Sequence, residues 1–330
     1  FSGGTFTDEN VIKEALKEIF YHYDDIDGNF LDQFQSINGF DARLWELFLF
    51  SLFREQQFTF DRNHEAPDYF VEKMNRKLAI EAVTIGRNQE SLKNVESFEP
   101  PSQEVVFGKL ENEMPLKFGS ALFDKMKKEY WKKEHIQGVP FVIAIADFHE
   151  GMSMTWSSSA IEKYLYGFKY EPHYDQGGNL IVKPIKINSF KKENGTEIPA
   201  GFFFQPNSEN VSAIIFSSAG TISKFNRMGK QAGLGSEKLS IRRYGLKHDH
   251  DKNASKPLAF NYIVSDDGNE SWSEGVSVYH NPNAKIPLDP NLFDDKIAQH
   301  MLIDNLITSI LPEFYPYSNI TMNMVSTDEI

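Results

Sequence analysis

Two carboxylates stand in one predicted hairpin of this chain, and their types and spacing suit a site for a divalent cation. The segments 67–71 and 77–85 have the pattern of strands joined by a turn between residues 74 and 75. In that register Asp68 falls opposite Glu81 on the same face, with Cβ atoms about 5 Å apart. Two carboxylates this close raise the pKa of one of them or recruit a cation. Oxygen-only ligation of this kind is what Mg²⁺ or Mn²⁺ prefers.

Glu81 is the odd residue in an otherwise apolar stretch, 78–83, where a charge is costly unless it is paired or bound to a metal. Glu46 poses the same question inside a largely apolar predicted helix whose N-cap we expect to be Asp41. We therefore expect Glu46, Asp68 and Glu81 to form a single metal site.

The order of these features points to a known family. A helix with Glu46 is followed by a strand, by Pro67-Asp68, by a turn and by Glu81 on an apolar strand. This order resembles the PD-(D/E)XK, or restriction-endonuclease-like, nuclease superfamily over residues 41–148. The resemblance implies an α-β-β-β-α-β core in which Glu46, Asp68 and Glu81 hold Mg²⁺ or Mn²⁺. It also implies attack of metal-activated water on a phosphodiester, with DNA as the first expected partner and RNA as the second.

The lysine of the superfamily motif should lie two residues after the strand acid, and Val83 occupies that position. Some members recruit the lysine from elsewhere, and we expect Lys125, on a predicted helix at 119–133, to fill the role. It would position or deprotonate water, or stabilise charge in the transition state. Lys128 and Lys132 follow at helical spacing and are expected to contact nucleic acid. If no lysine reaches the acids, the resemblance implies an inactive relative.

A second basic group follows a predicted strand and the segment 217–221, which could open a helix. It contains Lys224, Arg227 and Lys230. In a chain with a formal net charge of −13 this local basic stretch is informative. Contact with the backbone of a nucleic acid is the functional interpretation, and a solvated helix face is the alternative.

Composition bounds the class of protein. The chain has 330 residues, 40% of them hydrophobic, with 28 phenylalanines, which is ample material for a packed core. It has no cysteine, which excludes a disulfide framework, a thiolate zinc site and a cysteine nucleophile. We see no signal peptide and no apolar run of the roughly 20 residues that span a bilayer, so we expect a cytoplasmic protein without a membrane partner. The net acidity disfavours a general nucleic-acid coat protein but allows a local basic groove.

The predicted elements favour an α/β fold, with a mixed central sheet flanked by helices and extra C-terminal α+β elements. We expect an N-terminal helical segment (1–40), a nuclease-like core (41–235) with insertions at 88–117 and 150–200, and a C-terminal extension packed on the core (236–330). Other expected elements are helices at 9–23, 161–167 and 294–311, a hairpin at 176–196, and strands at 58–60, 141–148, 211–216, 258–264 and 275–279. A homodimer and a complex with a partner subunit both fit this class.

Two other functions stay open. The chain could keep the nuclease fold as a non-catalytic binding or scaffold protein, which Val83 and the net acidity favour, or it could be a metal-dependent hydrolase of another substrate. The whole chain also resembles a family of bacterial proteins of similar length, and that resemblance implies no particular activity. The segments that carry it are 27–30, 39–47, 153–156, 224–229, 272–275 and 280–284.

Overall fold

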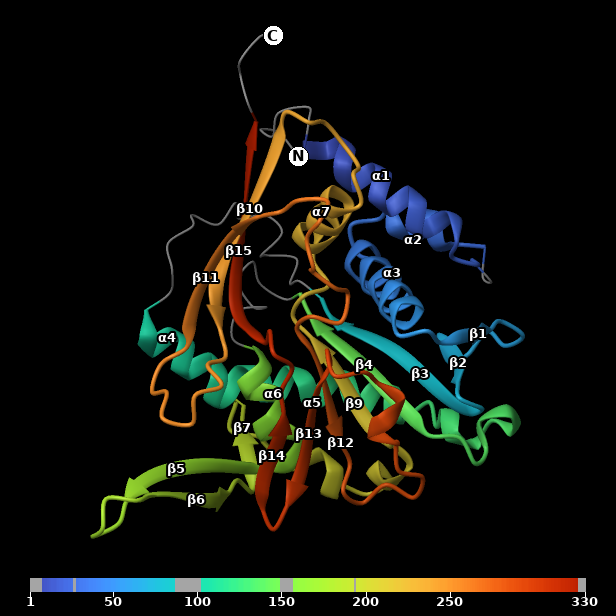
Figure 1. Cartoon of the computed structure of the whole chain (residues 1–330). Helices are drawn as coiled ribbons and strands as arrows, with labels where there is room; N and C mark the ends of the chain where they lie inside the picture. The colour runs from blue at the N-terminus through green and yellow to red at the C-terminus, as the bar shows by residue number, and fades with distance from the viewer. Residues whose placement is uncertain (1–7, 26–27, 87–101, 149–156, 193, 326–330) are drawn as a thin grey trace.

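A large mixed sheet with helices on both faces forms the centre of the molecule (Figure 1). The computed structural model describes residues 8–25, 28–86, 102–148, 157–192 and 194–325. The expected α/β class, with a mixed sheet flanked by helices, is confirmed. Segment 153–156 and the insertion residues 88–101 and 150–156 lie outside the described residues.

The central sheet has eight strands in the order β1-β2-β3-β4-β9-β12-β13-β14. Its strands are β1 (Thr59–Asp61), β2 (Tyr69–Lys73), β3 (Arg76–Ile85), β4 (Phe141–Asp147), β9 (Ala213–Ser217), β12 (Val276–His280), β13 (Ala298–Ile303) and β14 (Leu306–Ile310). The strands β1, β2 and β3 are antiparallel, whereas β3, β4 and β9 are parallel. Beyond β9, β12 is antiparallel to it, β13 is parallel to β12, and β14 is antiparallel to β13. The stretch after residue 236, expected as an extension, thus supplies three strands of the central sheet.

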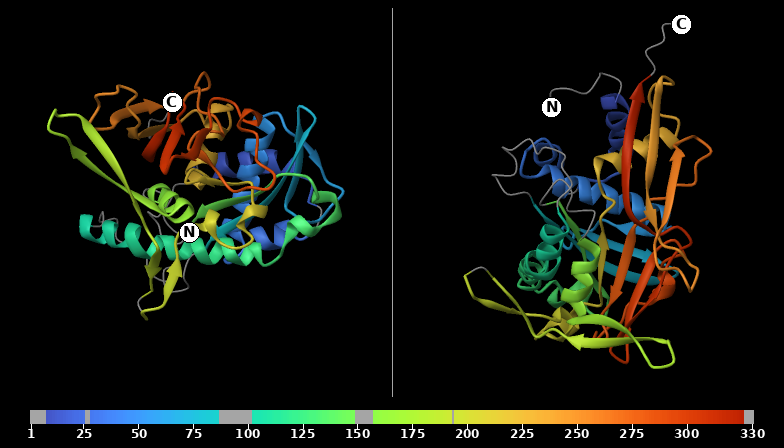
Figure 2. Two further views of the ribbon diagram at one scale, coloured as in Figure 1. Left: turned by 90° about the horizontal axis from the view of Figure 1, so that it is seen from below. Right: turned by 90° about the vertical axis from the view of Figure 1, so that its left-hand side faces the viewer.

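Three smaller sheets stand outside the central one. A three-stranded sheet contains β11 (Leu258–Ile263), β10 (Leu239–Lys247) and β15 (Pro316–Val325). The hairpin expected at 176–196 is two hairpins: β5 (Phe168–Tyr174) with β6 (Leu180–Lys186), and β7 (Ser189–Lys191) with β8 (Glu197–Pro199). Figure 2 shows the β5–β6 hairpin projecting from the body of the molecule.

The helices form the two outer layers (Figure 2). They are α1 (Asp8–Tyr21), α2 (Phe30–Phe34), α3 (Phe40–Glu55), α4 (Gln103–Gly108), α5 (Met114–Met126), α6 (Ser157–Tyr166) and α7 (Ile222–Gln231), with a π-helical turn (Lys109–Glu113) joining α4 to α5. The apolar side chains of α3 pack on one face of the sheet, and those of α5 and α6 pack on the other. None of the helices in the described ranges has the length and apolar character needed to cross a membrane.

Burial of α3 anchors the layer on its side of the sheet. All residues from Leu44 to Phe53 are buried, which is the pattern of a helix enclosed on every side. Trp45 Nε1 donates a hydrogen bond to the carbonyl oxygen of Ala144 in β4 at 3.1 Å. The N-cap is Gly39, without a side-chain cap bond, so the expected capping by Asp41 is wrong, and Asp41 lies in the first turn.

The expectation of a helix at 294–311 is wrong, because β13 and β14 form a hairpin there. Its turn consists of Asp304 and Asn305, with φ of 51° and 63°. Asp and Asn tolerate this left-handed backbone better than other non-glycine residues, and a two-residue turn of that kind reverses the chain. The apolar spacing of the segment fits both a helix and a strand, and the Asp-Asn pair was the signal that separates them.

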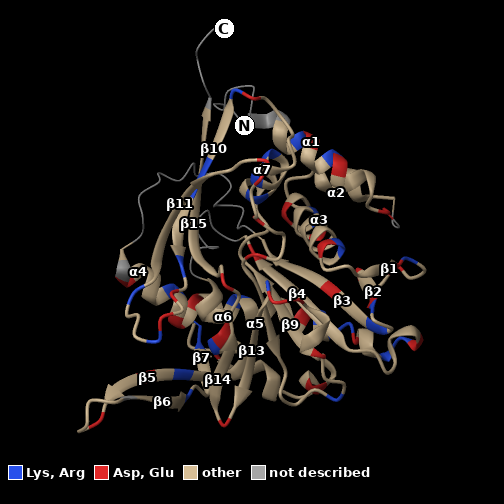
Figure 3. Ribbon diagram, viewed as in Figure 1, with Lys and Arg blue, Asp and Glu red and all other residues tan. Residues whose placement is uncertain are grey.

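Two of the three basic residues of α7, Lys224 and Arg227, lie inside the protein. Figure 3 shows basic residues and no acidic ones on this helix. Lys224 is 0% exposed and Arg227 is 2% exposed. Lys224 Nζ and Arg227 Nη2 lie 2.7 Å and 2.8 Å from Glu270 Oε1. Lys230 Nζ donates to the carbonyl oxygen of Ser236 at 3.1 Å. The expectation that Lys224 and Arg227 contact nucleic acid is therefore wrong, since both side chains form ion pairs with the buried carboxylate of Glu270.

Glu270 connects the two larger sheets through these charges. Arg243, in β10, lies 3.4 Å from Glu270 and 2.6 Å from Glu274. Burial opposes the ionisation of Glu270, but the charges of Lys224 and Arg227 outweigh it and hold the pKa of Glu270 below its usual value. The cluster is thus an ion network that joins α7, β10 and the segment before β12.

The substitution Glu270→Gln should lower the free energy of unfolding by about 3–5 kcal/mol, because it leaves buried cations without their counter-charge. Urea unfolding at pH 7 measures the change. Glu237→Gln, an exposed residue on the connection before β10, is the control and should change stability by less than about 0.5 kcal/mol. Equal unfolding midpoints for the two variants would contradict a stabilising network.

Candidate functional site

The hairpin of β2 and β3 sets the spacing of the two acids. Tyr69 pairs with Ile80, and the pairing continues in register to the end of β2. The turn residues Met74 and Asn75 have φ of 53° and 58°, the left-handed backbone of a two-residue type I′ turn. The register expected from the sequence is confirmed.

Asp68 lies one residue before β2, where this register places it opposite Glu81. Its Oδ2 accepts a hydrogen bond from the backbone N–H of Ala82 at 2.7 Å. Phe70 and Ala79, each two residues away along its own strand, pack in the core cluster that contains α5. Since side chains alternate along a strand, Asp68 and Glu81 share the face of the sheet that α5 covers.

Glu81 is a buried charge with its partners in place. It is 3% exposed within β3. Its Oε1 accepts hydrogen bonds from Lys125 Nζ at 2.6 Å and from the Tyr130 hydroxyl at 2.7 Å. Lys128 Nζ lies 4.0 Å from the same oxygen. These donors explain how a carboxylate is tolerated inside an apolar strand.

Lys125 comes from the last turn of α5 rather than from β3. Val83, two residues after Glu81, leaves the usual lysine position without a charge, and Lys125 reaches Glu81 from the next helix. The approach of Lys125 to the acids agrees with the expectation, and its role in catalysis stays a prediction.

The expected stripe of lysines does not form, because α5 ends at Met126 and not at 133. Lys132 lies in a 3₁₀ turn (Tyr130–Lys132) and pairs with Glu129 at 2.7 Å. Lys128, with a side chain 56% exposed, remains beside the acids. The turn after α5 also brings in Tyr130, which the sequence analysis missed. No spacing rule indicates Tyr130, since its position depends on how the chain leaves the helix.

Glu46 approaches the acids from the opposite layer. It is 8% exposed on α3, and its Oε2 accepts a hydrogen bond from Arg43 Nη1 at 2.7 Å. Its backbone oxygen accepts a hydrogen bond from the Tyr69 hydroxyl at 2.6 Å, which ties α3 to β2. Burial raises the pKa of Glu46, and the charge of Arg43 opposes the rise.

Asp68 is less well compensated than its neighbours. Burial raises the pKa of Asp68 to about 8, and the negative charges of Glu81 and Glu46 add to the rise. The charge of Lys125 and the N–H of Ala82 oppose it. Ionised Asp68 is therefore costly in the protein alone, and a cation beside it would relieve that cost.

The residues present fit a hard cation with carboxylate ligands. The hydrogen bonds described above use one oxygen of Asp68 and one of Glu81. Within the described ranges, no three His, Asp or Glu side chains converge closely enough to hold a metal ion. The expectation that Glu46, Asp68 and Glu81 form a single metal site is therefore wrong for the described structure. Asp68 and Glu81 remain the two carboxylates that face each other across the hairpin. Glu46, bonded to Arg43, would act through its charge.

Arg62 is a further residue that the sequence analysis missed. Its guanidinium lies over the rings of Tyr23 and Tyr69, at 5.0 Å and 5.3 Å from their centroids. Its Nη1 lies 3.4 Å from the backbone oxygen of Asp68, and its Nη2 is buried without a hydrogen-bond partner in the described structure. Arg62 thus adds positive charge beside Asp68, at the side of the site where Tyr23 and Tyr69 lie.

No protein-family model, curated protein or solved structure matches this chain. The function has to be inferred from the geometry of the site. The resemblance carried by Pro67-Asp68 and Glu81 stays a prediction.

Asp68→Asn should stabilise the protein in EDTA, and the gain should grow with pH. The unfolded pKa of Asp is near 3.8 and that of Asp68 in the fold is about 8, so ionisation costs stability that increases as the pH rises between these values. Asn keeps the acceptor for the Ala82 N–H. We expect a gain in Tm of roughly 2–5 °C at pH 8 and almost none at pH 4.

Thermal unfolding at both pH values checks this expectation. Asp124→Asn, an exposed residue of α5 paired with Lys127, is the control and should show no gain at either pH. A Tm for Asp68→Asn equal to or below that of the wild type at pH 8 would contradict it.

Proposed function

We propose that this protein is a metal-dependent nuclease that hydrolyses phosphodiester bonds, with DNA as the first substrate to test and RNA as the second. The observation that carries the proposal is the position of Lys125. Its ammonium lies 2.6 Å from Glu81, beside the acid pair of the β2–β3 hairpin. Two acids and a lysine meet here even though Val83 has replaced the lysine of the motif.

The order and sense of the elements also support the proposal. Helix α3 precedes the antiparallel strands β1, β2 and β3, and α5 then leads to β4, which is parallel to β3. This is the α-β-β-β-α-β order that the resemblance to the restriction-endonuclease-like superfamily implies. On this proposal, α6, β9 and β12–β14 are additions that widen the sheet.

The residues of the site have separable roles in this chemistry. A divalent ion, when bound, would supply Lewis-acid stabilisation of the phosphoryl oxygens and would lower the pKa of bound water. Asp68 and Glu81 would hold it, and the Ala82 N–H and Tyr130 hydroxyl orient these two carboxylates. The amino group of Lys125 lies beside Glu81, where it can stabilise charge that develops on the phosphate.

Lys128 is the basic residue near the acids that is open to a substrate backbone. Its side chain is 56% exposed. Contact with a phosphate would add salt-dependent affinity without base specificity. The local basic groove that an acidic nuclease needs would thus begin at Lys125 and Lys128.

A non-catalytic protein with the nuclease fold is the second candidate. The observation that favours it is the ion pair itself, since Lys125 and Tyr130 both bond to Oε1 of Glu81. Such a protein would bind nucleic acid without a requirement for a divalent metal. A hydrolase of another substrate would instead bind the metal without cutting nucleic acid.

Cleavage of single- and double-stranded DNA and of RNA, with Mg²⁺ or Mn²⁺ against EDTA, tests the proposal. We expect metal-dependent cutting by the wild type and a loss on the order of 100-fold or more in Asp68→Ala, Glu81→Ala and Lys125→Met. Lys127→Met is the matched control, because Lys127 is two residues away, 75% exposed and paired with Asp124. It should cut like the wild type.

Metal binding is measured separately by thermal unfolding, so that each outcome is informative. The proposal expects Mg²⁺ or Mn²⁺ to raise the Tm of the wild type and not that of Asp68→Asn. A metal-dependent Tm shift without any cutting would favour the hydrolase of another substrate. Binding of DNA with neither a metal shift nor cutting would overturn the proposal in favour of the binding protein.

A further inference from the structure

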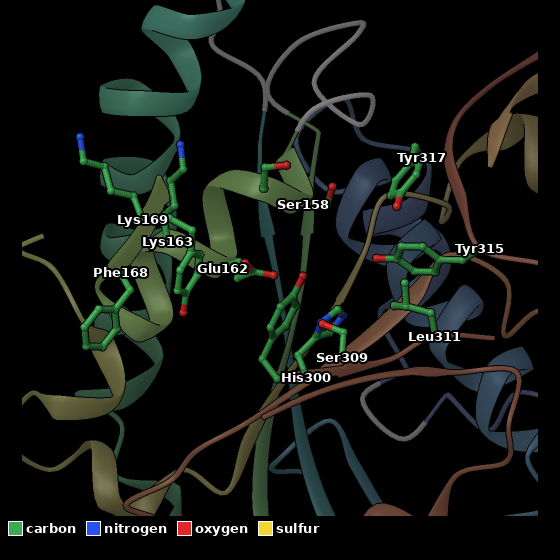
Figure 4. A pocket seen from close by; sticks show the side chains of 13 residues that line it. Ser158, Glu162, Lys163, Phe168, Lys169, His300, Ser309, Leu311, Tyr315 and Tyr317 are labelled. Carbon is green, nitrogen blue, oxygen red and sulfur yellow. The ribbon is translucent and has the colours of Figure 1, made fainter. Parts of the chain in front are cut away.

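A cavity lies on the face of the central sheet that carries the acids, and Figure 4 shows the residues that line it. Its volume is about 360 Å³. It lies between α6, the start of β5 and the strands β12–β14, with the segment that leads into β15 closing one side. Sites for small ligands commonly have volumes of this order.

The strand register separates this cavity from the nuclease-like site. One row of paired positions crosses the sheet from Glu81 through Ile143, Ile214 and Tyr279 to His300. Four strand spacings separate β3 from β13, which is roughly 19 Å. Ile143 and Ile214 are fully buried under the layer of α5 and α6. The two sites therefore lie on the same face of the sheet, and buried apolar side chains separate them.

Four tyrosines line the cavity, namely Tyr170, Tyr279, Tyr315 and Tyr317, and hydrogen bonds hold three of them in place. The Tyr170 hydroxyl accepts from the backbone N–H of Ile307 at 3.0 Å. The Tyr315 hydroxyl lies 3.1 Å from Ser277 Oγ, and that of Tyr317 lies 2.6 Å from His248 Nδ1. These bonds hold aromatic rings in place around the cavity before any ligand binds.

Glu162 is the charge that these rings surround. Figure 4 shows its carboxylate pointing in among the lining side chains, while the amino groups of Lys163 and Lys169 extend away from it. Lys163 forms an ion pair with Glu111, and Lys169 pairs with Glu171 at 3.5 Å. Among the described residues the carboxylate of Glu162 has no hydrogen bond and no ion pair. Burial raises its pKa to about 7, and the charge of Lys163 only partly opposes the rise.

Apart from Lys163 and Lys169, which pair with Glu111 and Glu171, the lining residues supply no cation. His300 Nδ1 lies 2.8 Å from Ser309 Oγ, and its Nε2 lies 3.3 Å from Ser277 Oγ. Burial lowers the pKa of His300 to about 4, so the ring is neutral at physiological pH. The cavity thus presents one uncompensated carboxyl group, aromatic rings and hydroxyl groups.

We propose that this cavity binds a small organic cation, a primary amine or guanidinium compound with an apolar or aromatic body. The charged head would pair with Glu162, where a charge-assisted hydrogen bond is strong because the site is largely buried. The body would lie along the tyrosine rings, which attract cations through their π faces. The site does not depend on the proposed nuclease activity.

Calorimetric titration of the full chain with tyramine and with agmatine tests this site, and adenosine monophosphate serves as the anionic comparison. We expect saturable binding of at least one amine and none of the nucleotide. Glu162→Gln keeps the shape of the side chain and removes the charge, and it should weaken amine binding at least about tenfold. Glu237→Gln, an exposed residue before β10 that does not line the cavity, is the control and should bind like the wild type.

Thermal unfolding shows whether each variant is folded. Glu162→Gln should melt at or above the temperature of the wild type, because it removes a buried carboxyl group that lacks a partner. Three outcomes would overturn the proposal. These are no saturable binding of either amine at millimolar concentration, equal amine affinity of folded Glu162→Gln and wild type, or binding of the nucleotide in place of the amines.

Discussion

Burial of the Glu81 charge is the constraint on which the arrangement of the first site depends. β3 lies between β2 and β4, so a carboxylate in the middle of this strand is shielded from bulk water and needs donors from the protein. Lys125 and Tyr130 provide them, and both come from the chain that follows β3. For this to happen α5 must end beside β3, and the turn after it must bring Tyr130 back toward the strand. The apolar face of α5, with Phe118 and Leu122 in the core, holds the helix in that position.

The buried acids Glu270 and Asp68 differ in how far neighbouring charges compensate them. Glu270 is surrounded by Lys224, Arg227 and Arg243, and its charge is compensated within the fold. Burial and the negative charges of Glu81 and Glu46 oppose the ionisation of Asp68. Only Lys125 and the N–H of Ala82 favour it. A compensated cluster contributes to stability and connects elements, whereas an undercompensated one costs stability and has affinity for a cation. This contrast separates the basic stretch of α7, whose charges pair with Glu270, from Asp68, whose negative charge the fold compensates only in part.

The eight-stranded sheet carries two polar sites on one face. The α5–α6 layer covers β3, β4 and β9 with apolar side chains, so polar groups are confined to the two sides of this layer. On one side lie Asp68 and Glu81, and on the other lie Glu162 and the tyrosine-lined cavity. A continuous row of paired positions connects the strands of the two sites, which are β2 and β3 for the acids and β12–β14 for the cavity.

The sequence by itself determined the local geometry of the acids. The hairpin register, the opposition of Asp68 and Glu81 and the burial of Glu46 followed from strand alternation and from the cost of a charge in an apolar segment, which are properties of neighbouring residues. The approach of Lys125 was also expected from the gap left by Val83. Where the local pattern was ambiguous, the expectation failed: residues 294–311 fit a helix and a strand alike, and only the Asp304-Asn305 turn separates the two.

The tertiary structure alone decided which partner each charge has. Whether Lys224 meets solvent or Glu270, whether Tyr130 reaches Glu81, and which rings enclose Glu162 depend on elements far apart in the chain, because long-range packing sets those distances and no spacing in the sequence encodes them.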